Sequence, residues 1–255
     1  MKSVFINTSG KVGSALILEN LVRGGFKRFE EDVLSFERFM TSPVDSVVHG
    51  HSLDFLLQAV SRWTSGSPYT TGSRVVVTGV REVLSASVSA FFQNIDNDKW
   101  DLWFFGPREH VLNAPIDNLI EFFESRVDTW LDEAVLPYPA RFDSIVGCSS
   151  CRPSDFLGGK VRVVYTPGYE VLFYRLEDFP KSLYKLFRIL GAEVLTQRFN
   201  AADQKWYSSV YAQFISRFNP SERLLTNTIY SEMMSMFYSE PELEKFWTKW
   251  RARRG

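Results

Sequence analysis

A strand, a loop of small residues and a helix follow one another at the start of the chain, and this order constrains the fold more than any other feature. Residues 3–7 form a short apolar run typical of a buried strand, and residues 15–22 carry apolar side chains at helical spacing. The loop between them leaves backbone N–H groups unpaired where the helix begins, and the helix dipole adds positive potential there. The segment therefore predicts a binding site for an oxyanion such as a phosphate.

The loop itself carries groups that suit an oxyanion but departs from the Walker A pattern. Lys11 supplies a full positive charge and Ser14 a hydroxyl donor. A Walker A loop requires Ser or Thr directly after its Lys and an upstream Gly, whereas this chain has Val12 and Phe5 at those places. The departures weaken an ATP-dependent kinase or NTPase interpretation. An ordinary β–α turn is the alternative interpretation of this loop.

A second strand–helix segment lies in the first half of the chain. Residues 74–80 are rich in β-branched apolar side chains, as in a parallel strand buried on both faces, and a helix is expected over about 83–95. Arg81 follows the strand, and Ser89 comes about two helical turns later. Both side chains can face the crevice where open α/β sheets bind nucleotides. A surface Arg and an unremarkable helix Ser are the alternative interpretation.

Together the two segments resemble the PAPS-dependent sulfotransferases, where PAPS is 3′-phosphoadenosine 5′-phosphosulfate. In that family a strand–loop–helix with a loop Lys holds the 5′-phosphosulfate, and an Arg followed eight residues on by a Ser holds the 3′-phosphate. Arg81 and Ser89 have this spacing. The loop Gly-Lys-Val-Gly-Ser at 10–14 and the segment Gln-Lys-Trp-Tyr-Ser at 204–208 are similar to a bacterial capsular polysaccharide synthesis subgroup, named for an Asn-Lys-Trp-Tyr-Ser motif.

The resemblance implies a set of nucleotide-binding residues and a product, PAP, the same nucleotide without the sulfuryl group. Lys205 would contact the 3′-phosphate, and Trp206 or Tyr207 would stack on adenine, although packing into the core explains Trp206 equally well. Ala15 stands where many sulfotransferases carry a second hydroxyl or an Arg, and Gln204 replaces the Asn of the naming motif. The implied binding residues are Gly10, Lys11, Val12, Gly13, Ser14, Ala15, Arg81, Ser89, Lys205, Trp206 and Tyr207.

A general base is predicted at the end of the strand expected over residues 46–49. The run His49-Gly50-His51 places two of the three histidines of the chain there, and imidazole titrates near neutral pH. The run resembles a His-Gly-His segment of uronyl and heparan 2-O-sulfotransferases, which implies that His51 is the base and that His49 supports it or contacts substrate. Lys11 would stabilise the transferring group. His51 as a cap of the next helix is the alternative, and the reserve bases are Glu82, Asp54 and Glu177.

Composition limits the number of domains, the classes of partner and the location that can be expected. With 255 residues, 45% hydrophobic content and a net charge of −1, the chain suits one α/β domain and gives no case for nucleic-acid binding. No apolar stretch reaches the roughly 20 residues of a membrane span, and no signal peptide is evident, so a cytoplasmic location is expected. The single Cys148-x-x-Cys151 pair cannot complete a zinc site, and free thiols in a mobile loop are favoured over redox chemistry.

The expected fold is therefore a single α/β domain over residues 1–255, of P-loop type with three layers. Its central, mainly parallel sheet is flanked by helices, its C-terminal part is helical, and residues 136–160 form a lid or insertion. The expected function is metal-independent sulfuryl transfer from PAPS to a hydroxyl or amine, with a carbohydrate favoured as acceptor. The alternatives are transfer to a small hydroxylated metabolite, a P-loop phosphotransferase using ATP, and a degenerate nucleotide-binding partner in a biosynthetic complex.

Overall fold

The computed structural model describes most of the chain, with gaps at the N-terminal loop, before the third helix and in several connections. Its described residues divide into two compact units. Unit 1 comprises residues 1–81 and 139–199, and unit 2 comprises residues 82–138 and 200–255. The expectation of a single domain stays a prediction. The described residues are 2–7, 13–30, 32–42, 45–50, 53–65, 72–99, 101–135, 143, 145, 147–195 and 205–252.

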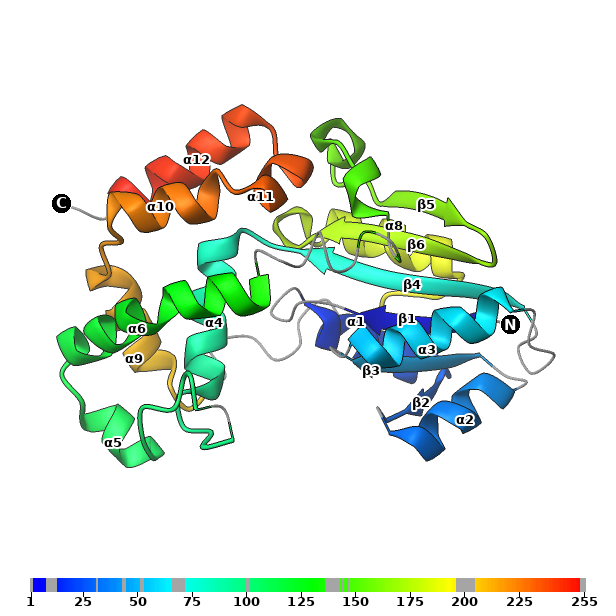
Figure 1. Ribbon diagram of the computed structural model, residues 1–255, viewed down its shortest axis with the longest axis horizontal. Coiled ribbons are helices and arrows are strands. Elements are labelled where there is room, and N and C mark those ends of the chain that lie inside the picture. Colours follow the sequence, from blue (N-terminus) through cyan, green and yellow to red (C-terminus); the bar gives the residue numbers. More distant parts are fainter. Residues whose placement is uncertain are drawn as a thin grey trace. The chain divides into compact units, whose positions relative to one another are not determined.

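Unit 1 is built on a six-stranded sheet with the order β2-β3-β1-β4-β6-β5 (Figure 1). All neighbouring strands pair in parallel except β5 and β6, which are antiparallel. This arrangement, with helices on both faces of the sheet, confirms the predicted α/β class. The strands are β1 (Lys2–Asn7), β2 (Lys27–Phe29), β3 (Ser46–Gly50), β4 (Ser73–Val80), β5 (Arg162–Thr166) and β6 (Tyr169–Arg175).

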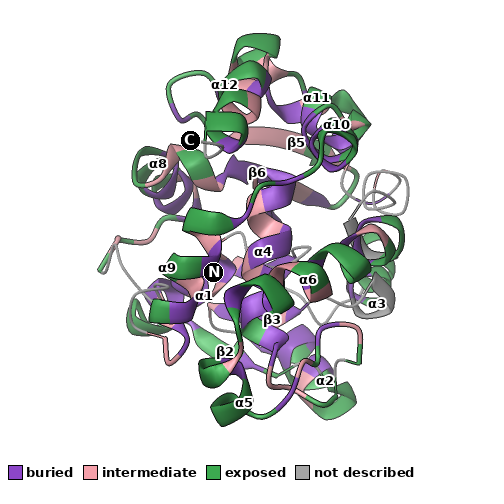
Figure 2. Cartoon of the chain, turned by 90° about the vertical axis from the view of Figure 1, so that its left-hand side faces the viewer, coloured by how far each residue is buried: buried purple, intermediate pink, exposed green. Residues whose placement is uncertain are grey.

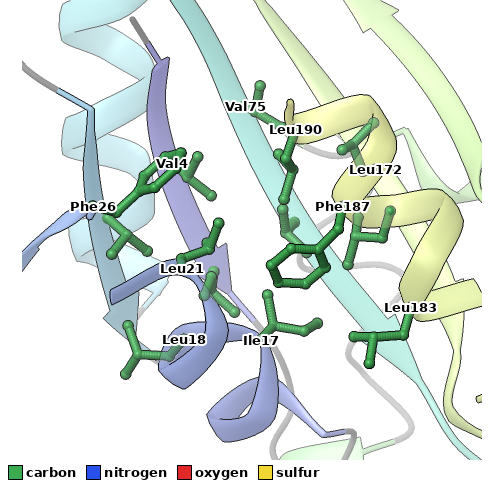
Figure 3. Packing of buried hydrophobic residues seen from close by; sticks show 14 of the residues in the cluster. Val4, Ile17, Leu18, Leu21, Phe26, Val75, Leu172, Leu183, Phe187 and Leu190 are labelled. Atoms are coloured by element: carbon green, nitrogen blue, oxygen red, sulfur yellow. The ribbon is translucent and has the colours of Figure 1, made fainter. Parts of the chain in front are cut away.

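One face of the sheet is covered by α1 (Ser14–Arg23) and α8 (Lys181–Leu190). Successive strand residues point to opposite faces, so Val4 and Ile6 of β1 meet Ile17 of α1 and Phe187 of α8 in one apolar cluster (Figure 3). These four side chains are at most 1% exposed, and burial of this kind contributes roughly 25 cal/mol per Å² of apolar area. The cluster fixes α1, and with it the start of α1, against the central strands.

The opposite face carries α2 (Val33–Thr41) and α3 (Leu53–Thr64). Phe39 of α2 packs on Trp63 of α3 with ring centroids 6.3 Å apart, and Trp63 packs on Tyr169 of β6 at 6.1 Å. The edge strand β5 is less covered: Figure 2 shows it in the intermediate colour, whereas β6 beside it is largely buried. The sheet is therefore the middle of three layers.

Unit 2 consists of helices in the part of it that the structure describes (Figure 1). Its core is aromatic: Phe91 and Phe92 of α4 both pack on Phe214 of α9, with centroids 5.8 and 5.1 Å away. The helices are α4 (Val83–Asn94), α5 (Arg108–Asn113), α6 (Ile116–Trp130) with its π-helical continuation η1 (Leu131–Val135), α9 (Ser208–Arg217), α10 (Glu222–Ile229), α11 (Glu232–Phe237) and α12 (Glu240–Arg251).

Candidate active site

The carboxyl ends of four parallel strands of unit 1 lie along one edge of the sheet. The register pairs Asn7 at the end of β1 with Gly50 at the end of β3, and Val80 at the end of β4 with Arg175 at the end of β6. In open α/β sheets this edge is where ligands bind. Of the predicted site residues in unit 1, Gly13, Ser14 and Ala15 come after β1, His49 lies one residue before the end of β3, and Arg81 directly follows β4.

Gly13 is the N-cap of α1 and has a left-handed backbone, with φ 81° and ψ 12°. It offers no side chain to occupy the first N–H groups of the helix, and the first turn contains no acidic residue. A Cβ at Gly13 would lie 2.9 Å from Leu176 Cδ1 and 3.0 Å from Phe179 Cε2, so the chain after β6 packs closely on this turn. The start of α1 is therefore a fixed, positively polarised N-terminus.

Ser14, the first residue of α1, lies within hydrogen-bond distance of His49. Their side chains approach to 3.0 Å between Ser14 Oγ and His49 Nε2, although the residues are 35 positions apart. Ser14 is 6% exposed, and His49 is half-buried in the penultimate position of β3. The structure thus brings together a residue predicted to bind the nucleotide and a residue predicted to support catalysis.

Four predicted residues, Gly10, Lys11, Val12 and His51, lie outside the described residues. The roles of Lys11 at the transferring group and of His51 as base stay predictions. Ala15 lies half-buried in the first turn of α1, where it can offer only its backbone to a ligand.

Two arginines stand at the carboxyl edge, and they differ in their surroundings. Arg81 follows β4 directly and is half-buried. Arg175 ends β6 with 3% exposure, and it donates from Nε to Asp178 Oδ2 at 2.6 Å and from a second nitrogen to Asp178 Oδ1 at 3.1 Å. This bidentate contact places Arg175 in an internal ion pair with Asp178. Glu177, a reserve base, is exposed beside it.

Glu82, another reserve base, lies at the start of a helix. It caps α4, is 1% exposed, and accepts hydrogen bonds from the backbone N–H of Leu84 at 2.7 Å and of Ser85 at 3.0 Å. The hydroxyl of Ser85 and the indole Nε1 of Trp250, at 3.2 Å, also donate to its carboxylate. Four donors directed at one buried carboxylate indicate a helix cap. Seven residues after this cap, Ser89 lies half-buried within the helix.

The predicted adenine-stacking residues lie at the start of α9 in unit 2. Tyr207 is 7% exposed and packs on Phe92 with centroids 5.6 Å apart, and burial raises the pKa of its phenol. Trp206 is half-buried, and the guanidinium carbon of Arg108 lies 5.2 Å from its ring centroid. Lys205 beside it is also half-buried. The Tyr207 ring belongs to the core of unit 2. Sequence reasoning missed Arg108, which carries no motif.

The two cysteines are free and buried. Burial raises the pKa of both thiols to about 12, and Cys148 Sγ donates to Asp143 Oδ1 at 3.4 Å. The sequence favoured free thiols, and both cysteines are free. The segment around them is not an irregular loop, because residues 147–160 include two short 3-10 helices, η2 (Cys148–Ser150) and η3 (Pro153–Phe156), and Phe156 is fully buried. Cys148 and Cys151 therefore sit in a packed segment, and the rest of the predicted lid lies largely outside the described residues.

The described residues contain neither a candidate metal site nor a candidate membrane span. No three His, Cys, Asp or Glu side chains of this part of the chain are grouped to hold a metal ion. Among the described helices, none combines the length and the apolar character that crossing a membrane requires.

Comparison with known proteins identifies the fold. No protein-family model matches the sequence, and no curated protein matches it. A solved structure, mouse sulfotransferase SULT7A1 complexed with PAP, is similar with a TM-score of 0.54. The match covers 95% of this chain and 88% of the mouse protein at 15% sequence identity. The chain therefore has a sulfotransferase fold, in agreement with the α/β architecture expected from its sequence.

Proposed function

We propose that this chain is a PAPS-dependent sulfotransferase. It moves the sulfuryl group of PAPS to a hydroxyl or amine of an acceptor, for which a carbohydrate is the favoured class, and releases PAP. The observation that carries the proposal is the start of α1, where an uncapped helix N-terminus and the Ser14 hydroxyl lie at the carboxyl edge of a parallel sheet. The fold that the chain shares with a sulfotransferase crystallised with PAP supports it.

The phosphosulfate is assigned to the loop and the first turn of α1. Gly10, Val12 and Gly13 offer backbone N–H groups, Ser14 offers its hydroxyl, and Lys11 offers a charge to the sulfuryl group and the bridging oxygen. Ala15 contributes its backbone only, so the proposed site has one side-chain contact fewer than many sulfotransferases.

The remainder of PAPS is assigned residue by residue from the resemblance. Arg81 and Ser89 are proposed for the 3′-phosphate, together with Lys205. Trp206 is proposed for adenine in preference to Tyr207, because the Tyr207 ring is already buried against Phe92. Arginine provides the planar donor fork that suits a phosphate.

Transfer itself requires one proton acceptor and charge stabilisation. His51 takes the acceptor's proton as the acceptor oxygen or nitrogen attacks sulfur in line with the leaving group. The new bond to sulfur forms while the bond from sulfur to the bridging oxygen breaks, and that oxygen leaves on PAP with the electron pair. Lys11 stabilises the charge that develops on the bridging oxygen.

The proposal is tested by measuring PAP release from PAPS with a panel of hydroxyl- and amine-bearing saccharides and small metabolites. We expect acceptor-dependent release that EDTA does not change and that His51→Ala lowers by about two to four orders of magnitude. His110→Ala is the matched control, because His110 lies in α5 with its ring stacked on Phe105 at 5.1 Å. Full activity of His51→Ala contradicts the assignment of the base. Magnesium-dependent turnover of ATP without use of PAPS contradicts the proposed function.

A further inference from the structure

The contact between Ser14 and His49 couples two groups that each have limited hydrogen-bonding capacity. A serine hydroxyl has one proton to donate, and a neutral imidazole nitrogen either donates or accepts. The distance of 3.0 Å between Ser14 Oγ and His49 Nε2 is compatible with either direction. The direction decides what Ser14 can offer to a ligand at the start of α1.

The two directions have opposite consequences for an anion. If Nε2 accepts, the only hydroxyl proton of Ser14 is directed at His49, and the oxygen then presents lone pairs to a bound oxyanion. If Nε2 carries the proton and donates, the hydroxyl proton is available to the oxyanion. A hydrogen bond to an anion is stronger than one between neutral groups, so a bound phosphate favours the second arrangement.

We propose that His49 is a positioning residue, which donates from Nε2 to Ser14 Oγ and thereby directs the Ser14 hydroxyl proton at the 5′-phosphosulfate of the nucleotide. This inference rests on the proposed function, and it assigns His49 to binding of the nucleotide instead of contact with the acceptor. The two hydrogen bonds run in one direction, from imidazole to hydroxyl to oxyanion, so each polarises and strengthens the next.

The fold holds this pair in place from both sides. His49 is fixed by the parallel register of β3 with β1, in which it pairs with the buried Ile6. Ser14 is fixed by α1, whose Ile17 and Leu21 are fully buried against the sheet. With both backbones anchored in the same unit, little entropy is lost when a ligand requires this contact.

The test is a double-mutant cycle in PAP affinity, measured by calorimetry on the whole chain. Ser14→Ala and His49→Phe are each expected to weaken PAP binding by about tenfold, as for loss of one hydrogen bond to a charged group. The double variant is expected to bind PAP as Ser14→Ala does, because His49 acts through Ser14. His49→Gln retains an N–H donor and is expected to stay within about threefold of the wild type.

A second ligand separates positioning from general damage to the fold. Adenosine 3′-monophosphate lacks the 5′-phosphate, so His49→Phe is expected to leave its affinity unchanged, as measured by competition with PAP. The inference is overturned if the double variant loses PAP affinity by the product of the two single effects, or if His49→Phe weakens the binding of both ligands equally. Either result leaves the proposed function intact. Absence of PAP binding by the wild-type chain instead overturns the proposed function.

Discussion

The buried carboxylate of Glu82 has two possible roles, as the cap of α4 and as a base, and a substitution can distinguish them. Its carboxylate accepts from two backbone N–H groups at the start of α4, from the Ser85 hydroxyl and from Trp250 Nε1 at 3.2 Å. The substitution Glu82→Gln keeps the shape of the side chain but replaces one acceptor oxygen with an NH₂ donor. That donor then faces other donors in a site where the side chain is 1% exposed.

The expected cost follows from these contacts. Loss of a helix N-cap costs about 1 kcal/mol, and a buried donor without an acceptor costs about 1–3 kcal/mol. The free energy of unfolding should therefore fall by roughly 2–4 kcal/mol. For a chain of this size, such a loss lowers Tm by roughly 4–16 °C.

The assay is chemical and thermal unfolding of Glu82→Gln, followed by circular dichroism, with Trp250→Phe and the double variant completing a cycle. Trp250→Phe removes the indole donor, so the double variant should be less destabilised than the sum of the two single changes. Wild-type stability of Glu82→Gln together with a large loss of turnover would show that the carboxylate takes part in the chemistry and does not stabilise the start of α4.

The remaining predictions concern a glycine turn and the cysteine pair. Gly13→Ala should lose about 1–2 kcal/mol from its left-handed backbone and more from the contacts of the new Cβ, and it should weaken PAP binding. Gly25→Ala is the control, because Gly25 has φ 95° and an added Cβ would meet nothing within 4 Å, so its unfolding curve reports the backbone cost alone. If both variants lose the same free energy of unfolding, the contacts expected for a Cβ at Gly13 cost nothing, which contradicts the prediction. Because the pKa of Cys148 and of Cys151 is raised to about 12, iodoacetamide at pH 8 should alkylate both thiols far more slowly in folded than in unfolded protein, and rapid alkylation of the folded chain contradicts their burial. Between about pH 9 and 12 the unfolded thiols lose protons that the folded ones keep, so this contribution to stability falls as pH rises, and a flat stability profile over that window contradicts the shift.

The sequence predicted the elements whose side-chain patterns are strong. The apolar strands β1, β3 and β4 and the helices that follow them have the expected positions. The short strand β2 was missed because Lys27 and Arg28 are charged and exposed, and Phe29 is its one buried residue. The strands β5 and β6 lie on either side of a short turn. Their antiparallel pairing at the edge depends on the turn, and no periodicity specifies it.

The candidate site was predictable in its residue types and less so in its contacts. The loop after one strand and the His-Gly-His run at the end of another draw attention to Ser14 and His49, and the resemblance to sulfotransferases supplies their expected roles. Their contact depends on the parallel pairing of β1 with β3, which joins residues 35 positions apart and leaves no local signal. The guanidinium of Arg108 over Trp206 is likewise a tertiary contact between residues far apart in the chain.

The start of α1 and Arg81 are proposed to belong to one PAP-binding site. Calorimetric titration of the purified chain with PAP, with ADP and ATP as controls, measures this binding. We expect micromolar PAP affinity that magnesium does not change and that Arg81→Ala weakens by about tenfold or more, since one charge-assisted contact to a phosphate is lost. Absence of PAP binding, or a preference for ATP with magnesium, would mean that the chain shares the sulfotransferase fold without its chemistry.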